Sequence, residues 1–189
     1  YNYQDYIKEC INSCLSQENS DLTFEVIVVN DGSTDNTKSI LDKFNDNKLK
    51  KFTIKNSGIE VASNLGFKKS SGKFIVRVDA DDSLDSNFLS SIQKILKMNY
   101  AFFYSDYRII DKKSEFICNV YLPKFEASEI FKRGDFLATG TIYKRHIIQE
   151  IGFYNIYQKN SGLENYELIL KILKLGFKGF HISKNLFNY

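Results

Sequence analysis

The chain has 189 residues, of which 43% are hydrophobic and 15% aromatic, and its formal net charge is +3. This length is typical of one domain, and the apolar content is sufficient for a core, which excludes a wholly disordered chain. No apolar run reaches the roughly 18 residues of a membrane-spanning helix, and no signal-peptide pattern opens the chain. The basic residues form no dense block, so the charge pattern argues against a nucleic-acid partner.

Cysteine and histidine are scarce, with 3 and 2 copies. Their spacing does not match a zinc site. We interpret Cys10, Cys14 and Cys118 as free thiols, with the first two packed as small apolar side chains, which is typical of a reducing compartment.

Helices and strands alternate in the first half of the chain. In chain order, the patterns predict a helix at 6–15, a strand at 24–29, a helix around 40–44, a strand at 51–55, a helix at 58–69, a strand at 74–78, a helix at 88–96 and a strand at 101–104. This alternation favours an α/β fold with a mostly parallel central sheet and helices on both faces. Ligands of such sheets bind at the carboxyl ends of strands.

The second half is less regular. It contains short strands or a hairpin within 107–121, a helix at 126–131, a strand end and helix across 142–151, a helix at 164–175 that stops at Gly176, and a strand at 177–182. No repeat or low-complexity linker divides the chain, so we expect a single domain.

An acidic cluster follows the predicted strand at 74–78. Asp79, Asp81 and Asp82 lie within four residues, where their charges repel one another. Such a concentration predicts a hard cation, Mg²⁺ or Mn²⁺. The alternative is an ordinary turn before the next helix, but Asp85 and Ser86 are already well placed to cap that helix.

Another acidic residue, Asp31, follows a different predicted strand, the one at 24–29. A carboxylate there would accept hydrogen bonds from a ribose or a base. The alternative is a common Asp-Gly turn, with Thr34 or Asp35 capping the next helix.

Several short motifs occur in a fixed order along the chain. They are Tyr1-Asn2, Val28–Thr37, Asn56-x-Gly58, Ala62-Ser63-Asn64-x-Gly66, Gly72–Ile75, Val78–Asp82, Gly140-Thr141, Ile151–Phe153 and Glu164–Leu168. Together they resemble the family-2 glycosyltransferases over essentially the whole chain. The resemblance implies one GT-A-type catalytic domain over 1–189, with a nucleotide-binding half at 1–105 and an acceptor-side half at 106–189.

The resemblance also implies a first strand before Tyr1, next to the nucleotide, and a C-terminal tail after the last residue. Loss of that strand would expose unpaired edges and part of the core. We therefore expect this stretch alone to bind donor poorly or to fold marginally.

The implied activity is hexosyltransferase-like. A sugar passes, with inversion, from a UDP-linked nucleotide-diphosphate sugar to an acceptor hydroxyl in the synthesis of a surface glycan or polysaccharide. The resemblance implies a divalent metal, Mn²⁺ or Mg²⁺, and a glycan or lipid-linked acceptor. It further implies a cytoplasmic enzyme at the inner face of the membrane, with peripheral membrane contact. A sugar nucleotidyltransferase is a rival interpretation, but the motifs after Asp79 argue against it.

Positions that match the family's motifs imply roles for site residues. Tyr1 would stack on the base, and Asp31 would bind the base or ribose. Asp79 would sit by the ribose and metal, Asp81 would be the metal ligand, and Asp82 would face the donor sugar or the acceptor. The other predicted donor-binding positions are Asn56, Gly58, Ser63 and Ala80.

The sequence departs from the family pattern at the catalytic base. The family's base is typically the Asp of a Glu-Asp pair, whose position is taken here by Asn165, and an amide is not a useful proton acceptor. Glu164 and Glu167 lie nearby on the same predicted helix. The predicted catalytic set is therefore Glu164, Asn165 and Glu167. It leaves three alternatives: Glu164 is the base, Glu167 is the base, or the chain is a nucleotide-sugar-binding module with a degenerate base.

A second departure is Ser63, where many members have an Arg that approaches the diphosphate. Serine provides a hydroxyl but no charge. Lys68, Lys69 or a lysine elsewhere is then expected to compensate.

Overall fold

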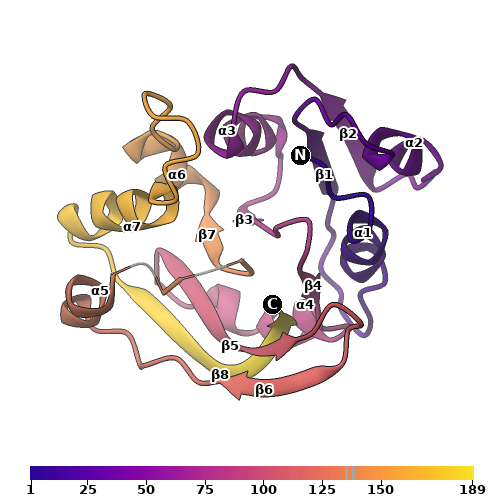
Figure 1. Cartoon of the computed structure of the whole chain (residues 1–189). Helices are drawn as coiled ribbons and strands as arrows, with labels where there is room; N and C mark the ends of the chain where they lie inside the picture. The colour runs from indigo at the N-terminus through magenta and orange to yellow at the C-terminus, as the bar shows by residue number, and fades with distance from the viewer. Residues whose placement is uncertain (135, 138) are drawn as a thin grey trace.

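Two sheets form the framework of the computed structural model, which describes residues 1–134, 136–137 and 139–189. The first sheet pairs β1 (Val26–Asn30) with β2 (Leu49–Thr53) in parallel. The second has six strands in the order β3-β7-β5-β8-β4, with β6 paired to β5 (Figure 1). Its strands are β3 (Phe74–Val76), β4 (Ser83–Leu84), β5 (Phe102–Ile110), β6 (Phe116–Val120), β7 (Ile142–Lys144) and β8 (Gly179–Asn188).

The predicted α/β class is confirmed, but the six-stranded sheet is mixed rather than mostly parallel. Within it, β5 and β8 pair in parallel, whereas the other pairings of described strands are antiparallel. The difference comes from the less regular second half of the chain, where the β5–β6 hairpin, β7 and β8 join strands from the first half. The hairpin expected within 107–121 is confirmed.

Helices flank both sheets. They are α1 (Ile7–Leu15), α2 (Thr37–Asp42), α3 (Ile59–Lys69), α4 (Phe88–Ile92), α5 (Ala127–Arg133), α6 (Arg145–Ile151) and α7 (Glu164–Lys174), with a 3-10 turn at Ile95–Lys97. In Figure 1, α1 and α2 lie beside β1 and β2, whereas α6 and α7 lie beside β7. Each predicted helix is present with ends shifted by a few residues, except that the helix predicted at 88–96 is divided into α4 and the 3-10 turn.

The largest apolar cluster packs α6 and α7 against the six-stranded sheet. Phe102, Tyr143, Ile148 and Leu168 are each at most 1% exposed within it. Burying side chains of this size contributes roughly 1.5–3 kcal/mol each. Gly179 is required here, because a Cβ atom would lie 2.4 Å from the Phe102 ring. This core holds the N-terminus of α7 near the end of β3.

The two sheets are not joined by a described strand. Among the described strands, β1 pairs only with β2, and β3 pairs only with β7. The strands β1 and β3 therefore each have one edge on which no described strand is paired. The first strand expected before Tyr1 stays a prediction.

Candidate active site

The turn after β1 gathers three of the predicted donor-binding residues. Asp31 is 5% exposed. Its Oδ1 accepts the N–H of Ser57 at 2.7 Å, and its Oδ2 accepts that of Gly58 at 2.9 Å. Asn56 donates from Nδ2 to the Asp31 carbonyl at 3.1 Å. Asp31 therefore fastens the 56–58 turn to the end of β1, and a ligand would have to share its carboxylate with these backbone groups.

The N-terminus lies against the same turn. The backbone N–H of Asn2 donates to Ser33 Oγ at 3.0 Å, and Asn2 Oδ1 accepts the N–H of Thr34 at 2.9 Å. Tyr1 is 52% exposed. Its ring is thus accessible at the end of β1, where the predicted stacking on a base would require it.

Arg77 organises the second cluster, and no sequence motif indicated it. Its Nε and Nη2 donate to the two carboxylate oxygens of Asp79 at 2.8 and 2.9 Å, and its Nη1 donates to Oε1 of Glu164 at 3.0 Å. Burial opposes the charge of Arg77, but these bonds raise its pKa further above the usual range. The sequence feature that could have indicated Arg77 is a charged residue within the apolar run 74–78, since a buried charge needs a partner.

The acidic residues after β3 differ in their surroundings. Asp81 is exposed and accepts no hydrogen bond from the described part of the chain. Asp82 is 4% exposed. Burial, together with the charges of Asp79 and Asp81, raises the pKa of Asp82 to about 7. Ala80, a predicted donor-binding residue, packs its side chain against the core cluster of α1 and α2.

These carboxylates do not form a complete metal site by themselves. Among the described residues, no three His, Cys, Asp or Glu side chains converge on one point. Arg77 engages both oxygens of Asp79, whereas Asp81 is accessible. Mg²⁺ is commonly held by one or two carboxylates together with substrate phosphates. The carboxylate of Asp81 is therefore available as a ligand for such an ion. The carboxylate of Asp79 would become available only if Arg77 released it.

Asn165 lies in the same cluster, where its side-chain oxygen acts as a hydrogen-bond acceptor. Its Oδ1 accepts from the Tyr154 hydroxyl at 2.5 Å and lies 3.4 Å from Arg77 Nη1. The backbone of Tyr154 pairs with the side-chain amide of Asn64 in both directions, each at 2.9 Å. Burial raises the pKa of Tyr154 to about 12, so its hydroxyl stays a donor.

The two candidate acids on α7 point to different places. Glu164 is 7% exposed, and its Oε2 is buried with no partner among the described residues. The side chain of Glu167 is 41% exposed and pairs with Lys171 at 3.0 Å along the helix. The structure thus unites Glu164, Asn165 and Asp79 through Arg77 and leaves Glu167 outside this cluster.

The lysines expected to compensate for Ser63 are engaged elsewhere. Ser63 lies in α3. Lys68 Nζ lies 5.6 Å from the centre of the Phe153 ring, and Lys69 Nζ lies 5.4 Å from that of Phe52.

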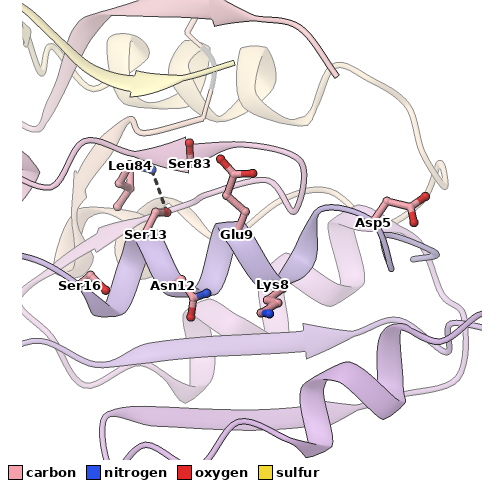
Figure 2. Close-up of a pocket in the computed structure, with 8 residues that line it drawn as sticks. All are labelled: Asp5, Lys8, Glu9, Asn12, Ser13, Ser16, Ser83 and Leu84. Atoms are coloured by element: carbon pink, nitrogen blue, oxygen red, sulfur yellow. Dashed lines mark hydrogen bonds between the residues drawn. The ribbon is translucent and has the colours of Figure 1, made fainter. Parts of the chain in front are cut away.

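A groove of about 560 Å³ runs along α1 (Figure 2). It is lined by Asp5, Lys8, Glu9, Asn12, Ser13, Ser16, Ser83 and Leu84. Ser13 Oγ accepts the N–H of Leu84 at 3.0 Å and so joins α1 to β4. None of the predicted site residues lines this groove.

Within the described ranges, no helix is long and apolar enough to span a bilayer.

Proteins of known sequence and structure resemble the chain throughout. The chain is 30% identical over 197 residues to the chondroitin synthase of Pasteurella multocida, covering 100% of this chain and 19% of that protein. It is 30% identical over 176 residues to the Escherichia coli UDP-Glc:alpha-D-GlcNAc-diphosphoundecaprenol beta-1,3-glucosyltransferase WfgD, covering 92% of this chain and 67% of that protein. The chain spans about a fifth of the length of the chondroitin synthase and of other relatives that it matches.

The fold has solved counterparts. The structure of residues 1–349 of S. aureus TarS superposes with a TM-score of 0.79 at 23% identity, covering 100% of this chain and 57% of that one. GalNAc-T7, solved with UDP, GalNAc and Mn²⁺, gives a TM-score of 0.79 at 17% identity, covering 97% of this chain and 41% of that one. These likenesses establish the GT-A-type fold.

Residues 1–157 match the profile described as glycosyl transferase family 2. This match covers most of the chain and includes the turn after β1 and the acidic segment after β3. The chain belongs to glycosyl transferase family 2.

Proposed function

We propose that the chain is the catalytic domain of an inverting, hexosyltransferase-like enzyme that uses a UDP-linked sugar. The observation that carries the proposal is the cluster in which Arg77 joins Asp79 to Glu164, beside the exposed Asp81. It combines a nucleotide-side carboxylate, an accessible cation ligand and a buried acid at one place. The names of WfgD and chondroitin synthase support a UDP-linked donor and a glycan or lipid-linked acceptor.

The donor would lie across the ends of β1 and β3. In the proposal, the exposed ring of Tyr1 stacks on the base, and Asp31 with the 56–58 turn borders the nucleoside. Asp79, oriented by Arg77, borders the ribose. Asp81 would hold the divalent ion, Mn²⁺ or Mg²⁺, which when bound offsets the negative charge of the diphosphate leaving group. Residues 1–105 thus provide the nucleotide side, and 106–189 the acceptor side.

We propose Glu164 as the general base. Its Oε1 is fixed by Arg77, and the buried Oε2 keeps its lone pairs for the acceptor hydroxyl. Loss of the hydroxyl proton to Oε2 allows the acceptor oxygen to attack the anomeric carbon from the face opposite the nucleotide. The bond from that carbon to the diphosphate oxygen breaks at the same time and UDP leaves with the electron pair, which gives inversion. Asn165, held by Tyr154, orients this region without accepting the proton. Glu167 points to solvent and takes no part in the proposal.

The presence of Asn165 favours one alternative, a nucleotide-sugar-binding module with a degenerate base. In this alternative, the donor binds at the same place and Glu164 serves only to pair with Arg77. Transfer activity distinguishes the two functions, because binding of the donor is common to both.

The setting we propose is the synthesis of a surface glycan or polysaccharide at the inner face of the cell membrane, with peripheral membrane contact. A panel of nucleotide sugars, tested with Mn²⁺ by isothermal titration and by release of nucleotide in the presence of glycan acceptors, tests the proposal. We expect a UDP-sugar to bind, and its sugar to be transferred with inversion as UDP is released. Binding without transfer would favour the module, and no binding of any nucleotide sugar would contradict both functions.

A further inference from the structure

The segment between α6 and α7 reaches back to the turn that follows β2. Lys159 Nζ donates to the side-chain Oδ1 of Asn56 at 2.5 Å and lies 3.5 Å from the carbonyl oxygen of the same residue. Asn56 in turn donates to the Asp31 carbonyl. An amine from the second half of the chain therefore lies at the end of β1, on the nucleotide side of the proposed site.

A buried carboxylate fixes the backbone next to this lysine. Glu60, in the first turn of α3, is 1% exposed. Its Oε2 accepts the N–H of Asn160 at 3.0 Å, and its Oε1 accepts that of Ser161 at 2.8 Å. Asn160 Oδ1 accepts the N–H of Ile59 at 3.2 Å. Burial acts to raise the pKa of Glu60, but the backbone bonds outweigh it and lower the pKa, so the anchor stays ionised near neutral pH.

Gly58 makes room for the lysine side chain. A Cβ atom at this position would lie 2.6 Å from Lys159 Cγ, and the φ angle of +98° is one that other residues rarely adopt. The close approach of Lys159 to the turn thus depends on Gly58. This glycine directly follows Ser57, whose N–H donates to Asp31.

The charge balance of the site gives this amine a role. A nucleotide diphosphate would bring further negative charge to a site that already holds Asp31, Asp79 and Asp81. Arg77 is committed to two carboxylates, and Lys68 and Lys69 lie over aromatic rings. Lys159 is exposed, and within the described residues its amine contacts only neutral amide oxygens, so no carboxylate offsets its charge.

We infer that Lys159 is a donor-binding residue that pairs with the phosphate groups of the nucleotide sugar, and that Glu60 holds it in place. This inference rests on the proposed function. On binding, the amine exchanges the neutral oxygen of Asn56 for a charged phosphate oxygen, which is a stronger partner. A flexible lysine suits this exchange, because its point charge does not require one fixed geometry.

Titration of the whole chain with UDP and with uridine, each with Mn²⁺ present, tests the inference. We expect Lys159→Met to weaken UDP binding by about tenfold or more, the loss typical of one charged hydrogen bond, and to leave uridine binding unchanged. Lys159→Arg keeps the charge and should restore most of the UDP affinity. Glu60→Gln should weaken UDP binding in the same direction, with thermal melting showing that the variant is folded.

Lys55→Met is the matched control, because Lys55 is an exposed lysine directly before Asn56. An equal loss in this control would attribute the effect to general surface charge and overturn the inference. So would a Lys159→Met variant that binds UDP as the parent does, or one that loses uridine and UDP alike. A parent chain that binds neither ligand would instead contradict the proposed function.

Discussion

Arg77 binds both carboxylate oxygens of Asp79 through two parallel N–H groups, at 2.8 and 2.9 Å. This paired geometry is the strongest that arginine and a carboxylate form. The remaining terminal nitrogen of Arg77 donates to Glu164 at the start of α7. One side chain therefore orients acids from two distant parts of the sequence.

Replacement of Arg77 should be costly for stability. Arg77→Met would leave the buried Glu164 without a cation, and we expect a loss of about 3–5 kcal/mol in the free energy of unfolding. Arg77→Lys should lie between this variant and the parent, because lysine keeps a charge but lacks the planar fork. Urea unfolding measures both.

The matched control is Arg108→Met. Arg108 pairs with Asp85 at 3.1 Å, but these side chains are 33% and 24% exposed. A surface pair of this kind contributes about 0–1 kcal/mol. Similar losses from Arg77→Met and Arg108→Met would contradict the role given to the buried cluster.

Glu164→Gln separates catalysis from binding. The amide still offers Arg77 an oxygen but does not accept a proton, so we expect the transfer rate to fall by about 10²–10⁴-fold. UDP affinity should stay near that of the parent. Glu167→Gln is the control, and its rate should be unchanged because Glu167 pairs with Lys171 on the outer face. A large loss in Glu167→Gln, with none in Glu164→Gln, would reverse the assignment.

Asn165→Asp tests the degenerate-base alternative. A carboxylate at this position would accept hydrogen bonds from Tyr154 and Arg77, as the amide does now. We therefore expect the transfer rate to change by less than about tenfold, equivalent to about 1.4 kcal/mol in the barrier. A much larger gain in the same assay would mean that the parent lacks a working base.

Asp81→Asn should remove the metal-dependent part of UDP binding. Its side chain is exposed and bears no described hydrogen bond, so the thermal midpoint should hardly change. Titrations with and without Mn²⁺ measure the effect. Asp5→Asn is the control, since Asp5 is also exposed but lies in the groove along α1. Equal loss of the Mn²⁺ effect in both variants would show that the ion is attracted only by general negative charge.

Glu25 should make stability depend on pH at the start of β1. Burial acts to raise its pKa, but hydrogen bonds from Lys50 and Ser71 outweigh it and lower the pKa to about 2. The ionised Glu25 carboxyl stabilises the fold fully above its pKa in the unfolded chain, about 4.5. This stabilisation is lost as the pH falls from there through about 2. Glu25→Gln should cost roughly 1–2 kcal/mol at pH 7.

The pH profile of that variant gives the decisive comparison. The difference in unfolding free energy between Glu25→Gln and the parent should shrink as the pH drops below about 4.5 and be lost as the pH falls through about 2. A difference that stays constant over this range would mean that the ionised form of Glu25 does not contribute.

The sequence predicted the helices and most strands because their apolar periodicity is local. It also placed Asp31 and Asp79 at strand ends, where the structure has them. It did not reveal the mixed sheet, because strand direction depends on pairings such as the antiparallel one of Phe102 with Tyr143, residues that are far apart in the chain.

The candidate site was predictable only in part, for a related reason. Motif position indicated Glu164 and Asn165, but the choice between Glu164 and Glu167 depends on which one reaches Arg77. Lys159 matched no motif, and its place near Asn56 follows from contacts across 103 positions of sequence.

The position of β8 has a consequence for the order of folding. The last strand lies between β5 and β4, and His181 and Asp106, which are 75 positions apart, face each other across the β5–β8 pairing at 2.7 Å. The boundary between 1–105 and 106–189 falls inside β5. During synthesis, β5 and β4 cannot be joined in the sheet until β8 has left the ribosome. Contacts between residues so far apart in the sequence should make folding slow. Until β8 is in place, the unpaired edges of β5 and β4 are open to aggregation.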